Sequence, residues 1–424
     1  MIKNRLFLFL ILFIYSLLFY FIFNYQYKLD FSSLYSACEA LKNGINPYQV
    51  LTTSYLPEVK KLPANLNPPF VLWFFSLFIK LSYLKAVFLW LILSIALSII
   101  AARTLFILAF TKDSYLEIWR EFYFFYFALF STLINIAILQ LGFLLFFLIM
   151  LGYSALLKER DGVAGFLWGM AAAIKLFPAL LFIYLIKNKR MNAFNFMLAS
   201  FLLLSFIPAL LYGTELYQQY YSMLSRVLWY GDSWNASLYG YLFRLFIDNR
   251  NTMQSLFPIK LGFFLCFIIL VCIYYQKLEP LLSVKTLKIN HQGFCLTLIF
   301  MLLLSPFGWL YYFSLILFPL LLNLTTALQD KTKKQLYRWF LLLFLLNFPI
   351  DYVNAWDMSF MGRVGFYSFY FYGLLLLAYQ TIRNRELVTQ NFELKEFAFI
   401  EPIILSILSL GLFVFILSLL LRLL

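Results

Sequence analysis

Long runs of apolar residues, separated by short polar segments, recur along the whole chain. A transmembrane helix needs about 20 apolar residues, and many of these runs reach or approach that length. We expect membrane crossings at residues 6–24, 86–110, 122–138, 140–157, 193–212, 259–276, 291–308, 309–326, 339–350, 365–382 and 402–423. The pattern predicts an all-α, polytopic transmembrane helical bundle of about 11–13 membrane helices that form one integral membrane domain, residues 1–424.

Two further apolar stretches predict half-length or re-entrant helices. The first, 67–80, is short and begins with Pro68 and Pro69, which favour a helix start. The second, "GVAGFLWGMAAAIKLFPALLFIYLIKNKR", has basic residues at both flanks, so both of its ends are expected in the cytoplasm. Lys175 and Pro178 lie in its middle, where we expect two half-helices to meet. Irregular backbone at membrane depth is tolerated where it lines a cavity, so Lys175 is a candidate site residue.

Two polar segments are long enough to fold outside the membrane: a first external loop, 25–67, and a second, 213–258. Clusters of Lys and Arg mark cytoplasmic connections under the positive-inside rule. These clusters are "KNKR" at 187–190, "KTKK" at 331–334 and "RNR" at 383–385. Most polar chemistry then falls on the external side, including "SPFGW" at 305–309 and "DYVNAWD" at 351–357. This distribution favours an enzyme that works at that face, because a transporter places its polar residues near the midplane.

Asp30 opens the first polar segment and allows two interpretations. Residues 31–43 have the apolar spacing of an amphipathic helix, and Gly44 suits its end. Its polar positions are expected on the opposite face: Ser32, Ser33, Ser36, Glu39 and Lys42. Asp30 is a favoured N-cap for such a helix. A carboxylate at the membrane boundary is costly unless it is solvated or used, so general-base catalysis is the second interpretation.

The composition excludes a soluble domain and disfavours several kinds of site. Of the 424 residues, 64% are hydrophobic and 12% are charged, whereas a soluble domain has about 25% charged residues. The net charge of +14 gathers in the clusters between apolar runs, so it indicates orientation and not nucleic-acid binding. The four cysteines have no C-x-x-C spacing, and the chain has a single histidine, His291. It also lacks D-x-D and glycine-rich nucleotide-binding motifs. We therefore expect no metal and no cofactor.

Several segments, taken in order, resemble glycosyltransferase family 87, the polyprenyl-phosphate-mannose-dependent mannosyltransferases of GT-C type. They are "ACEALKNGINPY" after Asp30, "NPPF", Gln140, "GFLWGMAAAIKLFP", "NASLYGYLFR" and "LSPFGWLYY". The resemblance covers about residues 25–320. Two positions depart from the family pattern. Leu139 replaces a glycine before Gln140, and Tyr311 and Tyr312 stand where many members have histidine after the tryptophan.

The resemblance implies a mechanism. A hexose, expected to be mannose, would move from a polyprenyl-phosphate donor to a glycolipid or glycan acceptor, with inversion and without a metal. Asp30 would be the base, and Lys175 with Arg244 would stabilise the lipid phosphate that leaves. Other substrate-binding positions would be Tyr35, Tyr48, Gln140, Asn235 and Trp309. The protein is expected as a multi-pass protein of the cell (inner) membrane, in contact with membrane lipids, with its site on the external or periplasmic side.

The residues alone leave other interpretations open. Lys175 is also compatible with a lysine that snorkels to the interface, and Arg244 with an ordinary interfacial arginine. A lipid-linked saccharide transporter or flippase would share the groove and the cations but would not need Asp30. A non-catalytic membrane assembly partner would need none of these residues individually.

Overall fold

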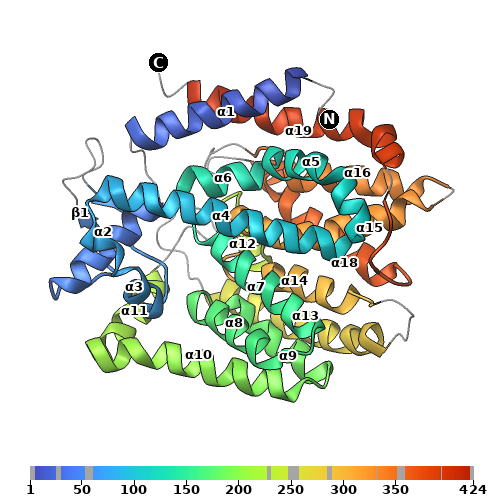
Figure 1. The fold of residues 1–424 in the computed structure, drawn as a ribbon. Coiled ribbons are helices and arrows are strands. Elements are labelled where there is room, and N and C mark those ends of the chain that lie inside the picture. Colours follow the sequence, from blue (N-terminus) through green and yellow to red (C-terminus); the bar gives the residue numbers. More distant parts are fainter. Residues whose placement is uncertain are drawn as a thin grey trace.

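The computed structural model describes residues 5–24, 30–52, 61–226, 231–246, 257–283, 289–330, 332–350, 359–392 and 394–420. The protein is an all-α, polytopic helical bundle (Figure 1). The β structure in the described elements is a small antiparallel ribbon of β1 (Leu51–Thr52) and β2 (Lys61–Leu62). It lies in the first predicted loop, after the helix α2 (Asp30–Lys42).

Seven stretches within the described ranges are long and apolar enough to cross a membrane. Five are continuous helices: α1 (Arg5–Asn24), α4 (Tyr83–Ala109), α10 (Met191–Tyr212), α13 (Phe257–Ser283) and α19 (Leu394–Leu420). The other two combine shorter pieces: η4 (Leu310–Ile316) with α15 (Leu317–Leu328), and α17 (Phe360–Val364) with η6 (Phe366–Ser368) and α18 (Phe369–Arg383). The helices α5 (Lys112–Ala128) and α6 (Phe130–Ile138) meet at a break where the chain bends by 62°. If this pair counts as one span, the described ranges contain eight candidate spans.

The expected number of 11–13 membrane helices is higher because several apolar runs fold into helices shorter than a full crossing. The shorter helices are α3 (Pro69–Phe75) with η1 (Phe78–Lys80), α7 (Gly142–Leu157), α8 (Asp161–Ile174), η2 (Phe177–Ala179) with α9 (Leu180–Lys187), α14 (Gln292–Leu304) and α16 (Lys334–Asn347). Nearly all residues of α14 and α15 are buried, so the centre of the bundle is apolar on every side. Hydropathy does not distinguish a helix buried in protein from one that faces lipid.

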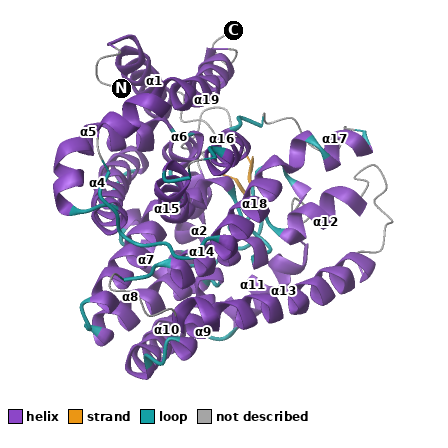
Figure 2. Ribbon diagram, turned by 90° about the vertical axis from the view of Figure 1, so that its right-hand side faces the viewer, coloured by secondary structure: helices purple, strands orange, loops and turns teal. Residues whose placement is uncertain are grey.

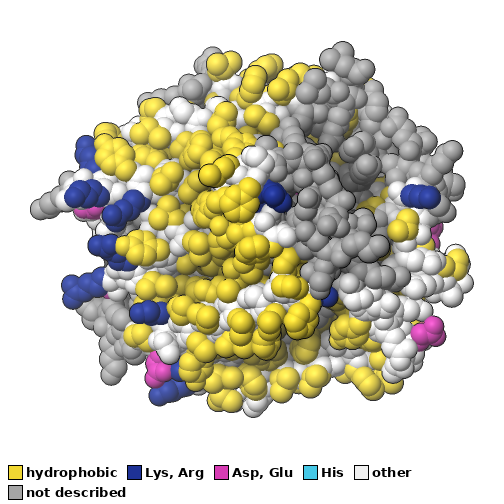
Figure 3. All heavy atoms as spheres, turned by 180° about the vertical axis from the view of Figure 1, so that it is seen from behind, with side chains coloured by type: hydrophobic (Ala, Val, Ile, Leu, Met, Phe, Trp, Pro, Cys, Tyr) yellow, Lys and Arg dark blue, Asp and Glu magenta, His cyan; other side chains and the backbone are white. Residues whose placement is uncertain are grey.

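The bundle has two chemically different ends. In Figure 1 α2, α3 and α11 (Glu215–Arg226) gather at the left, which we call the Asp30 end. Figure 3 shows Lys and Arg side chains along one edge of a broad hydrophobic surface, and this edge is the right-hand side of Figure 1. We call it the basic end. Figure 2, viewed from the basic end, shows α13, α17 and α12 (Leu238–Phe246) across the bundle from α4 and α5.

Two glycines allow α8 to pack closely against α10. A Cβ atom on Gly165 would lie 2.4 Å from the carbonyl oxygen of Ala193, and one on Gly169 would lie 2.5 Å from that of Met197. Small residues four apart let membrane helices approach with their backbones in contact. Ser200 fills the remaining space, and its hydroxyl donates to carbonyl groups of its own helix. The packing holds the end of α8, at Ile174, immediately before Lys175.

The predicted break at Lys175 is confirmed. α8 ends at Ile174, Lys175 has extended backbone (φ −146°, ψ 139°), and η2 and α9 continue after it. The 67–80 segment was predicted to be shorter than a full crossing, and it folds into two short helices, α3 and η1.

The helix predicted in the first loop is present, and of its polar positions Lys42 is exposed and Glu39 is half-buried. Ser32, Ser33 and Ser36 are all buried. The hydroxyl of Ser32 lies 2.7 Å from that of Tyr83, and the hydroxyl of Ser33 donates to the carbonyl oxygen of Pro63 at 2.8 Å. Short polar side chains are easily buried once each hydroxyl has a partner. α2 is packed into the Asp30 end.

Candidate functional site

Asp30 and Gln140 form a hydrogen-bonded pair at the Asp30 end. The amide nitrogen of Gln140 donates to Oδ2 of Asp30, which is the first residue of α2 and half-buried. The side-chain oxygen of Gln140 accepts the backbone N–H of Leu141 at 3.0 Å. This second bond fixes which end of the amide faces Asp30. Gln140 therefore holds the carboxylate in one position.

The tight turn between α6 and α7 explains why Gln140 can reach Asp30. Leu139 ends α6 in the left-handed conformation, with φ 53° and ψ 47°. Glycine takes this conformation without cost, whereas another residue pays about 1–2 kcal/mol. The glycine that the resemblance implies before Gln140 would suit such a turn. Here the turn is supported because the carbonyl oxygen of Leu139 accepts Trp90 Nε1 at 3.1 Å.

Lys175 brings a positive charge to the same carboxylate. It is half-buried at the break after α8, and its charge acts on Asp30. Its ammonium group donates to the carbonyl oxygen of Leu66 at 3.4 Å. Leu66 immediately precedes the "NPPF" segment that starts α3. One half-helix pair therefore contacts the other across the site.

The environment of Asp30 alters its proton affinity in two directions. Burial raises the pKa of the Asp30 carboxyl, while the Gln140 hydrogen bond and the Lys175 charge lower it. Burial is the largest of these effects, so the pKa stays above its ordinary value. A raised pKa makes a carboxylate a better proton acceptor near neutral pH.

Two tyrosines of η4 form another side of the site. Tyr311 and Tyr312 are buried and lie within electrostatic range of Asp30. The backbone of Tyr311 is held by Asn135, whose amide nitrogen donates to its carbonyl oxygen at 2.7 Å. Gly142 permits this contact, since a Cβ there would lie 2.4 Å from the same oxygen. The ring of Tyr312 is 5.0 Å from that of Phe177, which follows Lys175.

Arg244 occupies a second cluster, next to Asp232. Only 2% of Arg244 is exposed, and its Nη1 donates to the carbonyl oxygens of Asp232 and Asn235, each at 2.8 Å. Its Nε donates to Ser368 at 3.3 Å. The buried Nη2 has no hydrogen-bond partner among the described residues. Leaving a buried charged donor unpaired is costly.

Asn235 joins the loop that carries Arg244 to the segment that carries Trp309. Its amide nitrogen donates to the carbonyl oxygen of Pro306 at 2.9 Å, and its amide oxygen accepts the N–H groups of Gly308 and Ser237. Asn235 is fully buried. These contacts use the amide to connect two loops, and they position Trp309 through the bridge between residues 235 and 309.

Trp309 is half-buried and lies within a stack of aromatic rings. Its ring is stacked against Phe307 at 6.1 Å and against Tyr311 at 6.2 Å. Tyr311 lies within electrostatic range of both Asp30 and Asp232. Tyr311 is thus linked electrostatically to both clusters.

Tyr35 and Tyr48 use their hydroxyls to hold the first loop in place. The hydroxyl of Tyr35 donates to the carbonyl oxygen of Leu81 at 2.8 Å, and that of Tyr48 donates to the carbonyl oxygen of Asn67 at 3.1 Å. Both residues are buried. Tyr48 also packs against Tyr220 of α11, with ring centroids 5.2 Å apart.

The structure adds two groups to those expected from the sequence. The charges of Asp232 and Arg244 act on one another, and Tyr311 with Tyr312 lies within electrostatic range of Asp30. Burial raises the pKa of Asp232, against the effects of the Trp234 backbone N–H and the Arg244 charge. The sequence drew attention to the two tyrosines because they stand where the family pattern has histidine. Nothing in the local sequence pattern drew attention to Asp232. The "DYVNAWD" segment, 351–357, lies outside the described residues.

Comparisons with known proteins agree with this arrangement. The model of glycosyltransferase family 87 matches residues 65–306. The match includes Gln140, Lys175, Asn235 and Arg244, while Asp30 precedes it and Trp309 follows it. Neither the curated proteins nor the solved structures include a match. Because the matched segment is more than half of the 424 residues, this multi-pass membrane protein belongs to glycosyltransferase family 87.

Proposed function

We propose that this membrane glycosyltransferase moves a hexose, mannose in the simplest case, from a polyprenyl-phosphate donor to a lipid-linked or glycan acceptor. The observation that carries the proposal is the Asp30–Gln140 pair beside Lys175. It offers one oriented carboxylate with raised pKa and one cation, and these are the two charges that an inverting displacement at a lipid-linked sugar needs.

Asp30 would act as the general base. Its carboxylate takes the proton of an acceptor hydroxyl as that oxygen attacks the anomeric carbon. The bond from the anomeric carbon to the phosphate oxygen breaks at the same time, and the lipid phosphate leaves with the electron pair. The acceptor gains the sugar with inverted configuration, and the proton remains on Asp30 until it passes to water.

Lys175 would stabilise the departing phosphate as a point charge. Arg244, with its unpaired Nη2, would supply a second contact for an anionic or hydroxyl oxygen. Trp309 would stack on the face of the sugar ring, because it is partly accessible and its ring orientation is fixed by two neighbours. Asn235, Tyr35 and Tyr48 would act as positioning residues, since their polar groups already bind backbone atoms.

The Asp30 end would face the external or periplasmic side of the cell (inner) membrane. The basic edge in Figure 3 supports this orientation, because Lys and Arg are retained on the cytoplasmic side. A donor with its polyprenyl chain in the bilayer would then present its phosphate at the membrane boundary, near Lys175.

The test is transfer by purified protein in lipid, with polyprenyl-phosphate mannose and a panel of glycolipid acceptors. We expect the wild type to transfer the sugar and Asp30→Asn to lose at least about 10²-fold in turnover, the lower range for removal of a general base. The change keeps the shape of the side chain and much of its ability to cap a helix.

Asp113→Asn is the matched control, because Asp113 is exposed and also lies in the first turn of a helix, α5. It should leave turnover unchanged. If Asp30→Asn retains near-normal transfer, Asp30 has only a structural role at the start of α2 and is not the base. If neither protein transfers mannose from this donor, the assignment of donor and sugar is wrong.

A further inference from the structure

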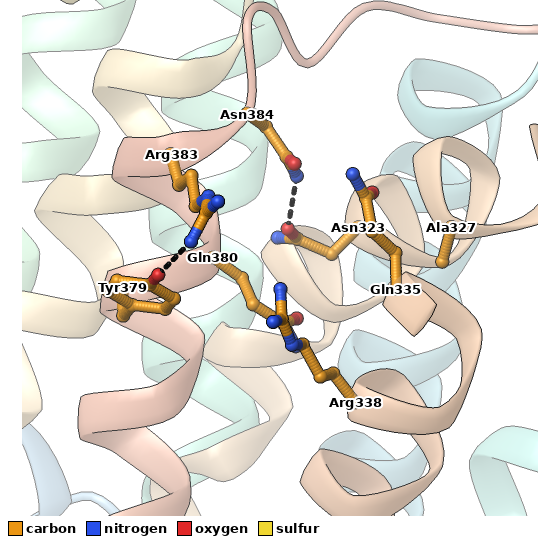
Figure 4. A pocket seen from close by; sticks show the side chains of 8 residues that line it. All are labelled: Asn323, Ala327, Gln335, Arg338, Tyr379, Gln380, Arg383 and Asn384. Carbon is orange, nitrogen blue, oxygen red and sulfur yellow. Dashed lines mark hydrogen bonds between the residues drawn. The ribbon is translucent and has the colours of Figure 1, made fainter. Parts of the chain in front are cut away.

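A polar pocket lies at the basic end, formed by α15, α16 and α18 (Figure 4). Its lining includes two guanidinium groups, four carboxamides and one phenol. The lining residues are Asn323, Ala327, Gln335, Arg338, Tyr379, Gln380, Arg383 and Asn384. None of these side chains is a carboxylate, so the positive charges of the two arginines are not neutralised by a member of the lining.

The base of the pocket is preorganised by hydrogen bonds between its own members. Asn384 donates to the side-chain oxygen of Asn323 at 2.7 Å, and Asn323 donates to the carbonyl oxygen of Pro319 at 2.8 Å. Arg383 donates to the hydroxyl of Tyr379 (Figure 4). These contacts hold the amides and one guanidinium in place before any ligand arrives.

Donors remain available for a ligand. The amide nitrogen of Gln380 is buried and has no hydrogen-bond partner among the described residues. Figure 4 shows Gln380 and Arg338 extending toward one another from facing helices. Buried donors are normally paired, so this nitrogen is available to an acceptor beyond the described residues. A group with several acceptor oxygens and a negative charge would pair with it and with both arginines.

We infer that this pocket binds a phosphate group, and that the anionic phospholipids of the adjacent leaflet supply it. The pocket opens among the basic clusters, where a headgroup phosphate of the membrane surface lies within reach. It is separate from the Asp30 site. Tyr312 and Ala327 are at opposite ends of the η4–α15 span, which sets them roughly 20 Å or more apart at helical rise.

The experiment is native mass spectrometry of the full-length protein in detergent, titrated with phosphatidylglycerol, phosphatidylcholine or inorganic phosphate. The test variant is Arg338→Gln/Arg383→Gln, and a second variant, Gln380→Leu, removes the unpaired donor. The control is Lys112→Gln/Arg120→Gln on α5, because both residues are exposed and the loss of charge is the same.

We expect the wild type and the control to bind phosphatidylglycerol in preference to phosphatidylcholine, and the arginine variant to bind it at least about tenfold more weakly. Gln380→Leu should also weaken binding while net charge is unchanged. Binding of inorganic phosphate with the same dependence, without selective lipid binding, would support the phosphate site and assign it to a free phosphate. An equal loss in the control, or no binding of either ligand, would overturn the proposal.

Discussion

At the scale of single residues, Gln140 is one of the groups that set how readily Asp30 is protonated. The Gln140 hydrogen bond lowers the pKa of Asp30, whereas burial raises it. A general base is active only when it is deprotonated, so transfer should fall as the pH drops through the pKa of Asp30. In a plot of transfer rate against pH, this fall in rate on the acidic side should lie at higher pH than for an ordinary aspartate, because the pKa of Asp30 is raised overall.

Gln140→Met should move this fall in rate to still higher pH, since it removes a bond that lowers the pKa of Asp30 while keeping side-chain length. The measurement is kcat/KM against pH for the wild type and the variant. Lys175→Met should shift the fall in rate in the same direction and also raise KM for the donor. A lower but pH-parallel activity in Gln140→Met would contradict the role, because that is the result of a purely structural contact.

Sequence reasoning found Asp30, Gln140 and Lys175 because each one interrupts an apolar pattern or matches a motif. It could not pair them, since 110 residues separate Asp30 from Gln140 and the bond depends on the turn at Leu139. Asp232 was missed for a related reason. Its importance comes from burial near Arg244, which only the tertiary structure creates.

At the scale of elements, the close approach of α8 and α10 places Lys175. Gly169→Ala would put a methyl group 2.5 Å from the carbonyl oxygen of Met197, so the helices must move apart. Overpacking of this kind costs about 1–3 kcal/mol. We therefore expect a lower midpoint of thermal unfolding in detergent, together with weaker donor binding.

Gly262→Ala in α13 is the control, because nothing lies within 4 Å of a Cβ at that position. Alanine is the better helix former by about 1 kcal/mol, so this change should leave the midpoint equal or higher. Equal behaviour of the two variants would mean that the α8–α10 contact does not limit stability.

Helix breaks were easier to predict than helix exposure. Pro68, Pro69, Pro178 and the isolated Lys175 mark breaks through local chemistry, and the structure has them. The burial of α14 and of the serines in α2 depends on neighbours far along the chain. Local periodicity carries no information about those neighbours.

At the scale of the whole molecule, the distribution of basic residues predicts the orientation of both ends. Gln218 is exposed on α11 at the Asp30 end, and Lys334 is exposed at the start of α16. In a Cys272→Ser background, Gln218→Cys should react with a membrane-impermeant maleimide in intact cells. Lys334→Cys should react only after the membrane is permeabilised. The reverse pattern would place the Asp30 site in the cytoplasm.

The contacts of Asp30 also set an order of assembly during synthesis. Chains are made from the N-terminus, so α2 is complete long before Gln140, Lys175 and the Tyr311–Tyr312 pair have left the ribosome. Until then the Asp30 carboxylate has neither its amide donor nor its cation, and it is best accommodated in water at the membrane surface. We therefore expect α2 to dock against the bundle late. A nascent chain shorter than about 312 residues lacks part of the proposed site, so we expect sugar transfer only after most membrane segments have been inserted.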